Sequence, residues 1–161
     1  MRVLGIDPGS VVTGIGVVES RRGRLRFIDG DYVRTSAQQP MGDRLLLIYE
    51  GLIAAIERNQ PEEIAIEAIF RHKSSESALR LGQARGVALL AAAQKGYQAA
   101  EYNPMTVKKT IGAHGRADKG GIARMVSMLL NIDVPGPKMP LDVSDALAIA
   151  ITHCLYARSR R

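Results

Sequence analysis

Two short apolar runs, each ending in an acid, constrain the fold of this chain more than any other feature of its sequence. Residues 3–6 predict a buried strand that stops at Asp7, because the Pro-Gly pair that follows does not continue a central strand. Residues 62–67 predict a second short strand that also ends in an acid, Glu67. Parallel strands of an α/β sheet present their carboxyl ends at one edge, where ligands bind. The sequence therefore predicts Asp7 and Glu67 at a shared edge.

The remaining segments predict a mixed sheet with helices between its strands. Residues 11–19 are β-rich and residues 25–34 alternate, so with residues 3–6 they form an antiparallel meander of three strands. Residues 98–102 predict a fifth strand. Helical periodicity or helix-start residues predict helices in five other segments, at 40–59, from Ser74 to Ala93, at 104–109, at 122–130 and from Leu141 onward.

Length and composition are those of one globular domain, residues 1–161. No apolar run reaches membrane-spanning length and no secretory leader precedes the first strand, so we expect a cytoplasmic protein without a membrane partner. The net charge of +6 favours polyanionic partners. Residues 1–80 hold 11 basic and 11 acidic residues and residues 81–161 hold 11 and 5, so the excess is regional. The one cysteine, Cys154, excludes an intrachain disulfide and is typical of a buried helix position.

Two segments leave alternatives open. Gly14 and Gly16 share one face of the second strand and leave it without side chains, either for a neighbouring helix or for a ligand backbone passing over Asp7. Residues 86–93 are apolar on every side of a helix, so one face must meet something besides its own sheet. We favour a dimer interface there over a central helix of the monomer.

Asp142 and Asp145 are three residues apart, so a helix that starts near residue 141 places both on one face. Acids in a first helical turn also cap the backbone and favour the helix dipole, and Asp7-Pro8-Gly9 is a common turn signal. A local structural role therefore stays open for each acid taken alone. The apolar residues after Asp145, however, indicate a helix buried almost from its first turn, where a carboxylate needs a cation or a partner.

Four acids on three elements can meet at one sheet edge: Asp7, Glu67, Asp142 and Asp145. Four carboxylates in one cleft repel one another, but they supply the hard oxygen ligands that two divalent cations need. Two such ions about 3.5–4 Å apart activate water and stabilise the leaving oxygen in phosphodiester hydrolysis. No Gly-x-x-x-x-Gly-Lys phosphate loop is present, and metal-ligand spacing is missing among His72, His114 and His153. The pattern indicates metal-dependent hydrolysis of a nucleic acid.

The motifs of the chain closely resemble those of the bacterial RuvC-type Holliday junction resolvases. The resemblance runs almost end to end and rests on residues 5–10 (GIDPGS), 65–67 (AIE), 77–87 (SALRLGQARGV) and 142–153 (DVSDALAIAITH). It implies an RNase H-like α/β fold, with a five-stranded mixed sheet of three antiparallel and two parallel strands and helices on both faces. It also implies a homodimer that nicks four-way DNA junctions symmetrically in recombination and repair. Two Mg²⁺ per active site, with Mn²⁺ as a substitute, and a branch-migration helicase complex as partner come from the resemblance alone.

The resemblance further implies that the four acids are catalytic metal ligands. Lys108 and Lys119 match basic residues near the scissile phosphate, with the neighbouring Lys109 as an alternative to Lys108, and Phe70 matches an aromatic residue that stacks at the junction. Lysines there would hold phosphates and offset developing charge. An aromatic wedge flanked by basic residues can unstack a base while its neighbours grip the backbone, although a core phenylalanine beside solvated charges is the alternative. The expected DNA-binding set is Phe70, Arg71, Lys73, Lys108, Lys109, Arg116 and Lys119.

Three other functions compete with this interpretation. Asp-x-Gly after a strand also resembles the phosphate loop of actin-like ATPases, but those need two such domains around the nucleotide. Related RNase H-like nucleases process ribosomal RNA, and the basic region from Lys108 to Lys119 favours junction DNA over that substrate. A non-catalytic junction-binding protein would not keep four acids facing phosphates, because uncompensated anions weaken DNA binding.

Overall fold

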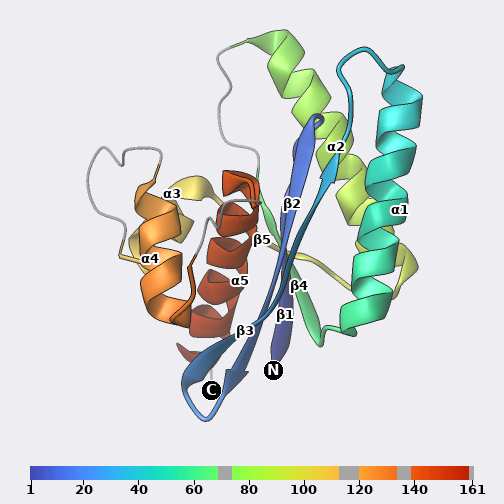
Figure 1. The fold of residues 1–161 in the computed structure, drawn as a ribbon. Helices are drawn as coiled ribbons and strands as arrows, with labels where there is room; N and C mark the ends of the chain where they lie inside the picture. The colour runs from blue at the N-terminus through green and yellow to red at the C-terminus, as the bar shows by residue number, and fades with distance from the viewer. Residues whose placement is uncertain (69–73, 113–119, 134–138, 160–161) are drawn as a thin grey trace.

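A computed structural model describes residues 1–68, 74–112, 120–133 and 139–159 of the chain. Its centre is one five-stranded mixed sheet in the order β3-β2-β1-β4-β5 (Figure 1). The first three strands form the predicted antiparallel meander, and β4 and β5 continue the sheet parallel to β1. The strands are β1 (Arg2–Asp7), β2 (Val12–Arg21), β3 (Arg24–Arg34), β4 (Glu63–Glu67) and β5 (Ala100–Tyr102). The predicted mixed sheet is thereby confirmed.

The fifth strand is shorter than the predicted residues 98–102, because it begins only at Ala100. The side chain of Tyr97 explains part of the difference. Its hydroxyl donates a hydrogen bond of 2.7 Å to the carbonyl of Pro61. The chain is thus tied to the loop before β4 and joins the sheet two residues later than its sequence suggests.

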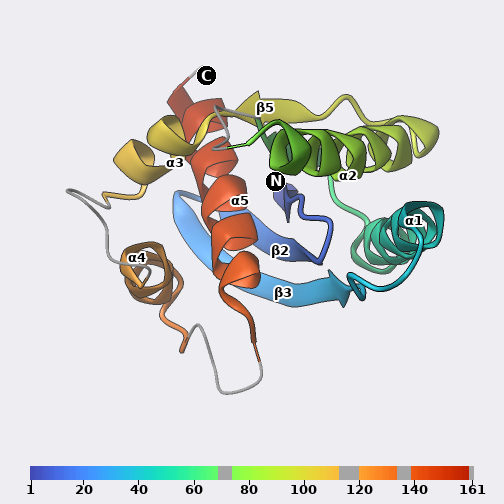
Figure 2. The same ribbon diagram turned by 90° about the horizontal axis from the view of Figure 1, so that it is seen from above.

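Helices cover both faces of the sheet (Figure 2). One layer holds α1 (Met41–Asn59) and α2 (Ser75–Gln94), and the other holds α3 (Pro104–Thr110), α4 (Gly121–Leu130) and α5 (Leu141–Ser159). Each layer closes its own apolar core against the sheet, and alternate side chains of the strands point into the two cores. None of the helices described here is long and apolar enough to cross a membrane.

Glycines in β1 and β2 decide how closely α5 approaches the sheet. A Cβ atom at Gly5, Gly14 or Gly16 would collide with the backbone of α5, at Ala146, Asp142 and Leu147 respectively. The bare glycine face predicted from Gly14 and Gly16 therefore receives a helix. This close approach brings the start of α5, with its two acids, beside the end of β1.

The apolar helix α2 covers the sheet with only one of its faces. Its buried residues Ala84, Ala88, Ala91 and Ala92 face the core that it shares with α1. On the uncovered side, Leu79 is 64% and Leu90 is 59% exposed. One face of α2 thus packs in the core of the monomer, and another apolar face is exposed. The dimer interface remains a prediction.

Candidate active site

Two strand ends deliver the first two acids. In the parallel pairing of β1 with β4, Gly5 lies opposite Ala65 and Ile6 opposite Ile66. The next residue of each strand is an acid, so Asp7 and Glu67 emerge side by side at the carboxyl edge of the sheet, as predicted. Both strands are buried up to that point and both acids are partly exposed. A rigid apolar scaffold therefore ends in two neighbouring carboxylates.

Helix α5 supplies the other two acids from its first turns. Asp142 and Asp145 are partly exposed, whereas Val143 and Ser144 between them are buried. The charge of Asp142 raises the pKa of both Asp7 and Asp145, so this acid lies within electrostatic reach of its neighbours. The helix-start acids are consequently not only caps, because they share the sheet edge with Asp7.

Helix α3 brings a cation to the same place. The side chain of Asn103 accepts a hydrogen bond of 2.8 Å from the amide of Thr106, and Pro104 follows as the first helical residue, which together fix the start of this short helix. Val107 is buried and anchors the helix, while Lys108 and Lys109 are exposed. Lys108 borders the acidic pocket and Lys109 does not. The structure thus distinguishes two lysines that the sequence leaves equivalent.

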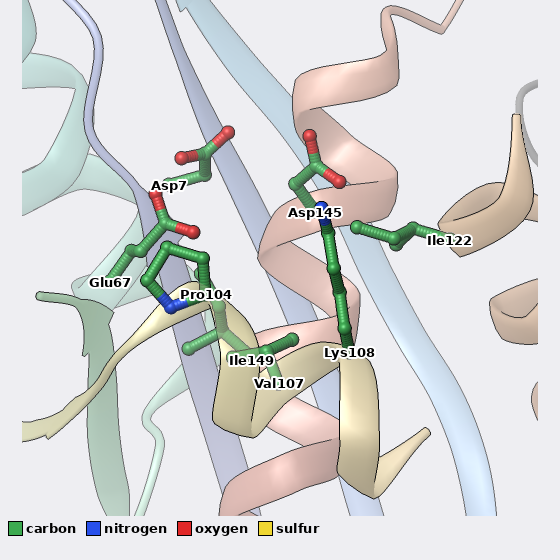
Figure 3. A pocket seen from close by; sticks show the side chains of 8 residues that line it. All are labelled: Asp7, Glu67, Pro104, Val107, Lys108, Ile122, Asp145 and Ile149. Atoms are coloured by element: carbon green, nitrogen blue, oxygen red, sulfur yellow. The ribbon is translucent and has the colours of Figure 1, made fainter. Parts of the chain in front are cut away.

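These elements enclose an open pocket of about 270 Å³. Figure 3 shows the carboxylates of Asp7 and Glu67 on one side and that of Asp145 on the other, with the chain of Lys108 extending toward Asp145. Apolar side chains form the rest of the wall. The lining residues are Asp7, Glu67, Pro104, Val107, Lys108, Ile122, Asp145 and Ile149.

Burial and mutual repulsion raise the pKa values of the pocket acids. Desolvation is the largest cause at each of them and holds the pKa of Asp7 well above its usual range, with further contributions from Glu67, Asp145 and Asp142. The pKa of Glu67 rises to about 7 and that of Asp145 to about 6. Lys108 opposes the rise at both of the latter residues. Among the described residues that line the pocket, three acids thus face one lysine, Lys108.

This donor set fits hard divalent cations in its chemistry. Carboxylate oxygens are the ligands that Mg²⁺ prefers, and a cation would relieve the repulsion that raises the pKa values. In the described part of the chain, no three Asp, Glu, His or Cys side chains lie close enough to enclose one metal ion. The acids therefore form an open arrangement in this structure.

The other predicted DNA contacts and histidines divide into two groups. Phe70, Arg71, Lys73, Arg116 and Lys119, with His72 and His114, lie outside the described residues. His153 is a packed residue: hydrogen bonds join its two ring nitrogens to the hydroxyl of Tyr102 and the carboxylate of Glu63. Cys154 is buried as well, and burial raises the pKa of its thiol to about 12.

The sequence analysis missed the apolar wall of the pocket, of which Ile149 and Ile122 are the clearest members. Ile149 was within reach, since it lies four residues after Asp145 and therefore on the same face of the helix. Ile122 comes from α4 and gives no local signal, because only the packing of α4 beside α5 brings it to the pocket.

Comparison with known proteins agrees with this geometry. The family model described as "Crossover junction endodeoxyribonuclease RuvC" matches residues 3–153. The protein of that name from Moorella thermoacetica is 47% identical over 161 residues, which cover all of this chain and 95% of the relative. Its counterpart from Chloroflexus aurantiacus is 47% identical over 158 residues and covers 98% of this chain and 94% of the relative. The solved structure "T. thermophilus RuvC in complex with Holliday junction substrate" superposes with a TM-score of 0.86 at 35% identity and covers 99% and 96% of the two chains.

The mixed sheet, the helices on both faces and the acids at the carboxyl edge define an RNase H-like protein. Within that class, the family match and the full-length similarity decide the assignment: the chain belongs to the RuvC family of crossover junction endodeoxyribonucleases.

Proposed function

We propose that this chain resolves four-way (Holliday) DNA junctions by Mg²⁺-dependent, symmetric cleavage of two strands during recombination and DNA repair. As a member of the RuvC family it is an endodeoxyribonuclease that acts at crossover junctions. One observation carries the mechanistic part of the proposal. Three acids and one lysine from separate elements, Asp7, Glu67, Asp145 and Lys108, line a single open pocket.

In this proposal Asp7, Glu67, Asp142 and Asp145 hold two Mg²⁺ ions, with Mn²⁺ as a workable substitute. Bound there, the ions supply an activated water and stabilise the leaving oxygen. Each carboxylate acts in its ionised form, and cation binding lowers the pKa values that repulsion raises in the free protein. Lys108 lines the same pocket as the acids, and in this proposal it holds a phosphate oxygen and offsets charge that develops on it.

The excess of acids argues against a protein that only binds junctions. A passive DNA-binding surface gains affinity from cations that face phosphates. This chain is basic overall, yet its acids line the same pocket as Lys108. This arrangement weakens DNA binding until metal neutralises it, so hydrolysis accounts for it better than binding does.

We further propose that the whole chain, residues 1–161, acts as one nuclease domain in the cytoplasm and works as a homodimer. A junction offers two equivalent strands, and a twofold axis would place two active sites symmetrically on them. The uncovered face of α2 around Leu79 and Leu90 is apolar and is our candidate for the interface. A branch-migration helicase complex is the proposed functional partner, on family resemblance alone.

The decisive experiment compares a synthetic four-way junction with a linear duplex of the same sequence, each incubated with the protein and Mg²⁺. We expect paired nicks at symmetric positions in the junction, an intact duplex and no nicking in EDTA. Equal cleavage of both substrates would contradict junction selectivity, and an intact junction would contradict the whole proposal.

The dimer is tested separately by sedimentation of the Leu90→Lys variant at micromolar concentration. We expect wild-type protein to sediment as a dimer and this variant as a monomer. Leu46→Lys is the matched control, because Leu46 is 54% exposed on the neighbouring helix α1. Wild-type protein that stays monomeric with and without junction DNA would exclude the dimer.

A further inference from the structure

Arg44, in the first turns of α1, is an unusual buried charge. Only 4% of the residue is exposed. Its guanidinium donates from Nη2 and Nε to the carbonyl oxygen of Ser10, at 2.5 and 3.1 Å, and Nε also approaches the hydroxyl oxygen of Thr35 at 3.2 Å. Among the residues that the structure describes, no carboxylate pairs with Arg44. Its partners are one backbone carbonyl and one hydroxyl.

Such an arrangement costs stability compared with an apolar side chain. Moving a cation out of water is unfavourable unless its surroundings compensate it. A methionine would fill similar space at the same position without that cost. What only arginine supplies is a rigid fork of donors that can converge on one oxygen atom. An arginine at position 44 is therefore explained by its two hydrogen bonds to the carbonyl oxygen of Ser10.

The carbonyl oxygen of Ser10 accepts three hydrogen bonds. The hydroxyl of Thr35 donates to it at 2.6 Å, in addition to the two donors of Arg44. The amide of Thr35 donates at 2.8 Å to the neighbouring carbonyl of Val11. Residues 10 and 11 are thus fastened both to the end of β3 and to the start of α1.

A buried threonine holds the turn at residues 8–11 by two further hydrogen bonds. Thr13, which is fully buried, donates its hydroxyl to the carbonyl of Gly9 at 2.8 Å and accepts from the Gly9 amide at 3.3 Å. Only Pro8, with its fixed φ angle, separates this fastened segment from Asp7. The backbone after Asp7 therefore has little freedom, although it is a turn at the edge of the sheet.

We propose that Arg44 is a positioning residue for cleavage: with Thr35 it holds the Ser10 carbonyl and thereby fixes the turn that aims Asp7 into the pocket. This inference rests on the proposed function, since it assumes that Asp7 binds metal. Arg44 acts on Asp7 through the backbone of the turn, because its donors reach Ser10 and Thr35 and not the carboxylate itself. Small displacements of a reacting group lower rates steeply, by about 100-fold for about 1 Å.

Arg58 provides a matched control on the same helix. It lies in the last turn of α1 and also ties that helix to β3, through Asp29 at 2.8 Å and Asp31 at 3.0 Å. Arg58 is half-exposed whereas Arg44 is buried, but both residues tie α1 to neighbouring elements, and only Arg44 adjoins the turn after Asp7. A purely structural role for Arg44 predicts that Arg44→Met, like Arg58→Met, changes the melting temperature and leaves nicking and metal affinity of the folded protein unchanged.

The test combines single-turnover nicking with direct metal binding, measured by calorimetric titration of Mn²⁺. For Arg44→Met and Thr35→Val we expect nicking to slow about tenfold or more and the Mn²⁺ Kd to rise by a similar factor, with junction affinity in EDTA unchanged. Arg44→Lys should behave like Arg44→Met, because it keeps the charge and loses the fork. Arg58→Met should keep wild-type nicking and metal affinity even if its melting temperature falls.

The outcomes separate the inference from the proposed function. Wild-type protein that fails to nick junctions removes the proposed function itself. Nicking by the wild type together with normal nicking and metal affinity in Thr35→Val, or equal losses in Arg44→Met and Arg58→Met, overturns the role of Arg44. Thr35→Val removes a single hydroxyl from a residue of the same shape, so it remains informative even if Arg44→Met does not fold.

Discussion

The two ends of the sheet treat their acids in opposite ways. At the end away from the pocket, acids have cationic or hydrogen-bonded partners: Glu62 lies 3.5 Å from the terminal ammonium, Glu19 lies 3.4 Å from Arg2, and Glu63 contacts His153. At the pocket end, three acids share Lys108. Acidic residues thus form ion pairs or hydrogen bonds at one end of the sheet, and at the other end three of them lie together beside one lysine.

The pKa values of the acids differ between the two ends of the sheet. At Asp29, which Arg58 and Asn59 contact at the far end of α1, burial acts to raise the pKa, but the hydrogen bonds from Asn59 and Arg58 prevail and lower it. At Asp7 burial and three neighbouring acids act in the same direction and raise the pKa. Paired acids therefore stabilise the ionised fold at neutral pH, whereas the cluster destabilises it. Such a cost is kept where a ligand offsets it.

The largest expected effect tests the cluster directly. Asp7→Asn keeps the shape of the side chain and removes the charge that holds a cation. We expect Mg²⁺-dependent nicking to fall on the order of 100-fold or more, while junction binding in EDTA stays the same or tightens because one anion fewer faces the phosphates. Nicking rates of Glu67→Gln, Asp142→Asn and Asp145→Asn extend the test. A variant with near-normal nicking removes its residue from the site, and four such variants would sink the two-metal mechanism.

Two adjacent lysines give the next comparison. Lys108 borders the pocket and opposes the raised pKa values of Glu67 and Asp145, whereas Lys109 does not line it. Lys108→Ala should slow single-turnover nicking by roughly 10- to 100-fold. Lys109→Ala should mainly weaken junction binding and make it less sensitive to salt. Equal loss of nicking in both variants would contradict the assignment of Lys108 to the scissile phosphate.

The sequence predicted where the acids lie in the fold, because the signal for their positions is local. A buried strand that stops at an acid is visible in residues 3–7 and 62–67, and three-residue spacing places Asp142 and Asp145 on one helix face. The choice between Lys108 and Lys109 was out of reach, because the phase of a seven-residue helix depends on which side chain it buries, here Val107.

Residues whose partners are distant in sequence were also out of reach. Arg44 looks like an ordinary charged residue of an amphipathic helix, and its partner Ser10 lies 34 positions earlier. The contacts of His153 likewise come from Glu63 and Tyr102, which lie 90 and 51 positions away. Local patterns thus reveal which residues end an element, and tertiary packing decides which of them meet.

Strand β4 carries a glutamate near each end of the sheet and offers a matched pair of substitutions. In EDTA at pH 8, Glu67→Gln should raise the melting temperature because it removes a crowded carboxylate. Glu63→Gln should lower it slightly, by the equivalent of about 1 kcal/mol or less, because it weakens a partly exposed contact with His153. Shifts of the same sign would contradict the contrast between the two ends.

The pH dependence of this difference has a definite sign. The pKa of Glu67 is raised to about 7 in the folded protein, from about 4.3 in an unfolded chain. Between these values the folded state binds more protons, so the contribution of Glu67 to stability falls as pH rises. The advantage of Glu67→Gln should therefore be small near pH 4, grow up to about pH 7 and level off above it. Mg²⁺ should stabilise the wild type more than the variant at pH 8.

The last comparison concerns two buried hydroxyls of α5 (Leu141–Ser159), one in its first turn and one past its middle. Ser144, between the acids Asp142 and Asp145, is fully buried and its hydroxyl lacks a hydrogen-bond partner within the described residues. Thr152, beside His153, is equally buried and donates to the carbonyl of Ala148 at 2.8 Å. Ser144→Ala should therefore stabilise the protein by about 1 kcal/mol, because it removes an unsatisfied polar group, and Thr152→Val should destabilise it by about as much.

Chemical denaturation in EDTA measures both changes, and a gain of this size corresponds to roughly 2–4 °C in melting temperature for a chain of this length. Nicking by Ser144→Ala should stay normal, since its hydroxyl is buried and does not line the pocket. If Ser144→Ala instead destabilises the fold as much as Thr152→Val does, the hydroxyl of Ser144 has a partner in solution. The contrast between the ends of the molecule would then be confined to the carboxylates, where it arises from charge rather than from a general lack of polar partners.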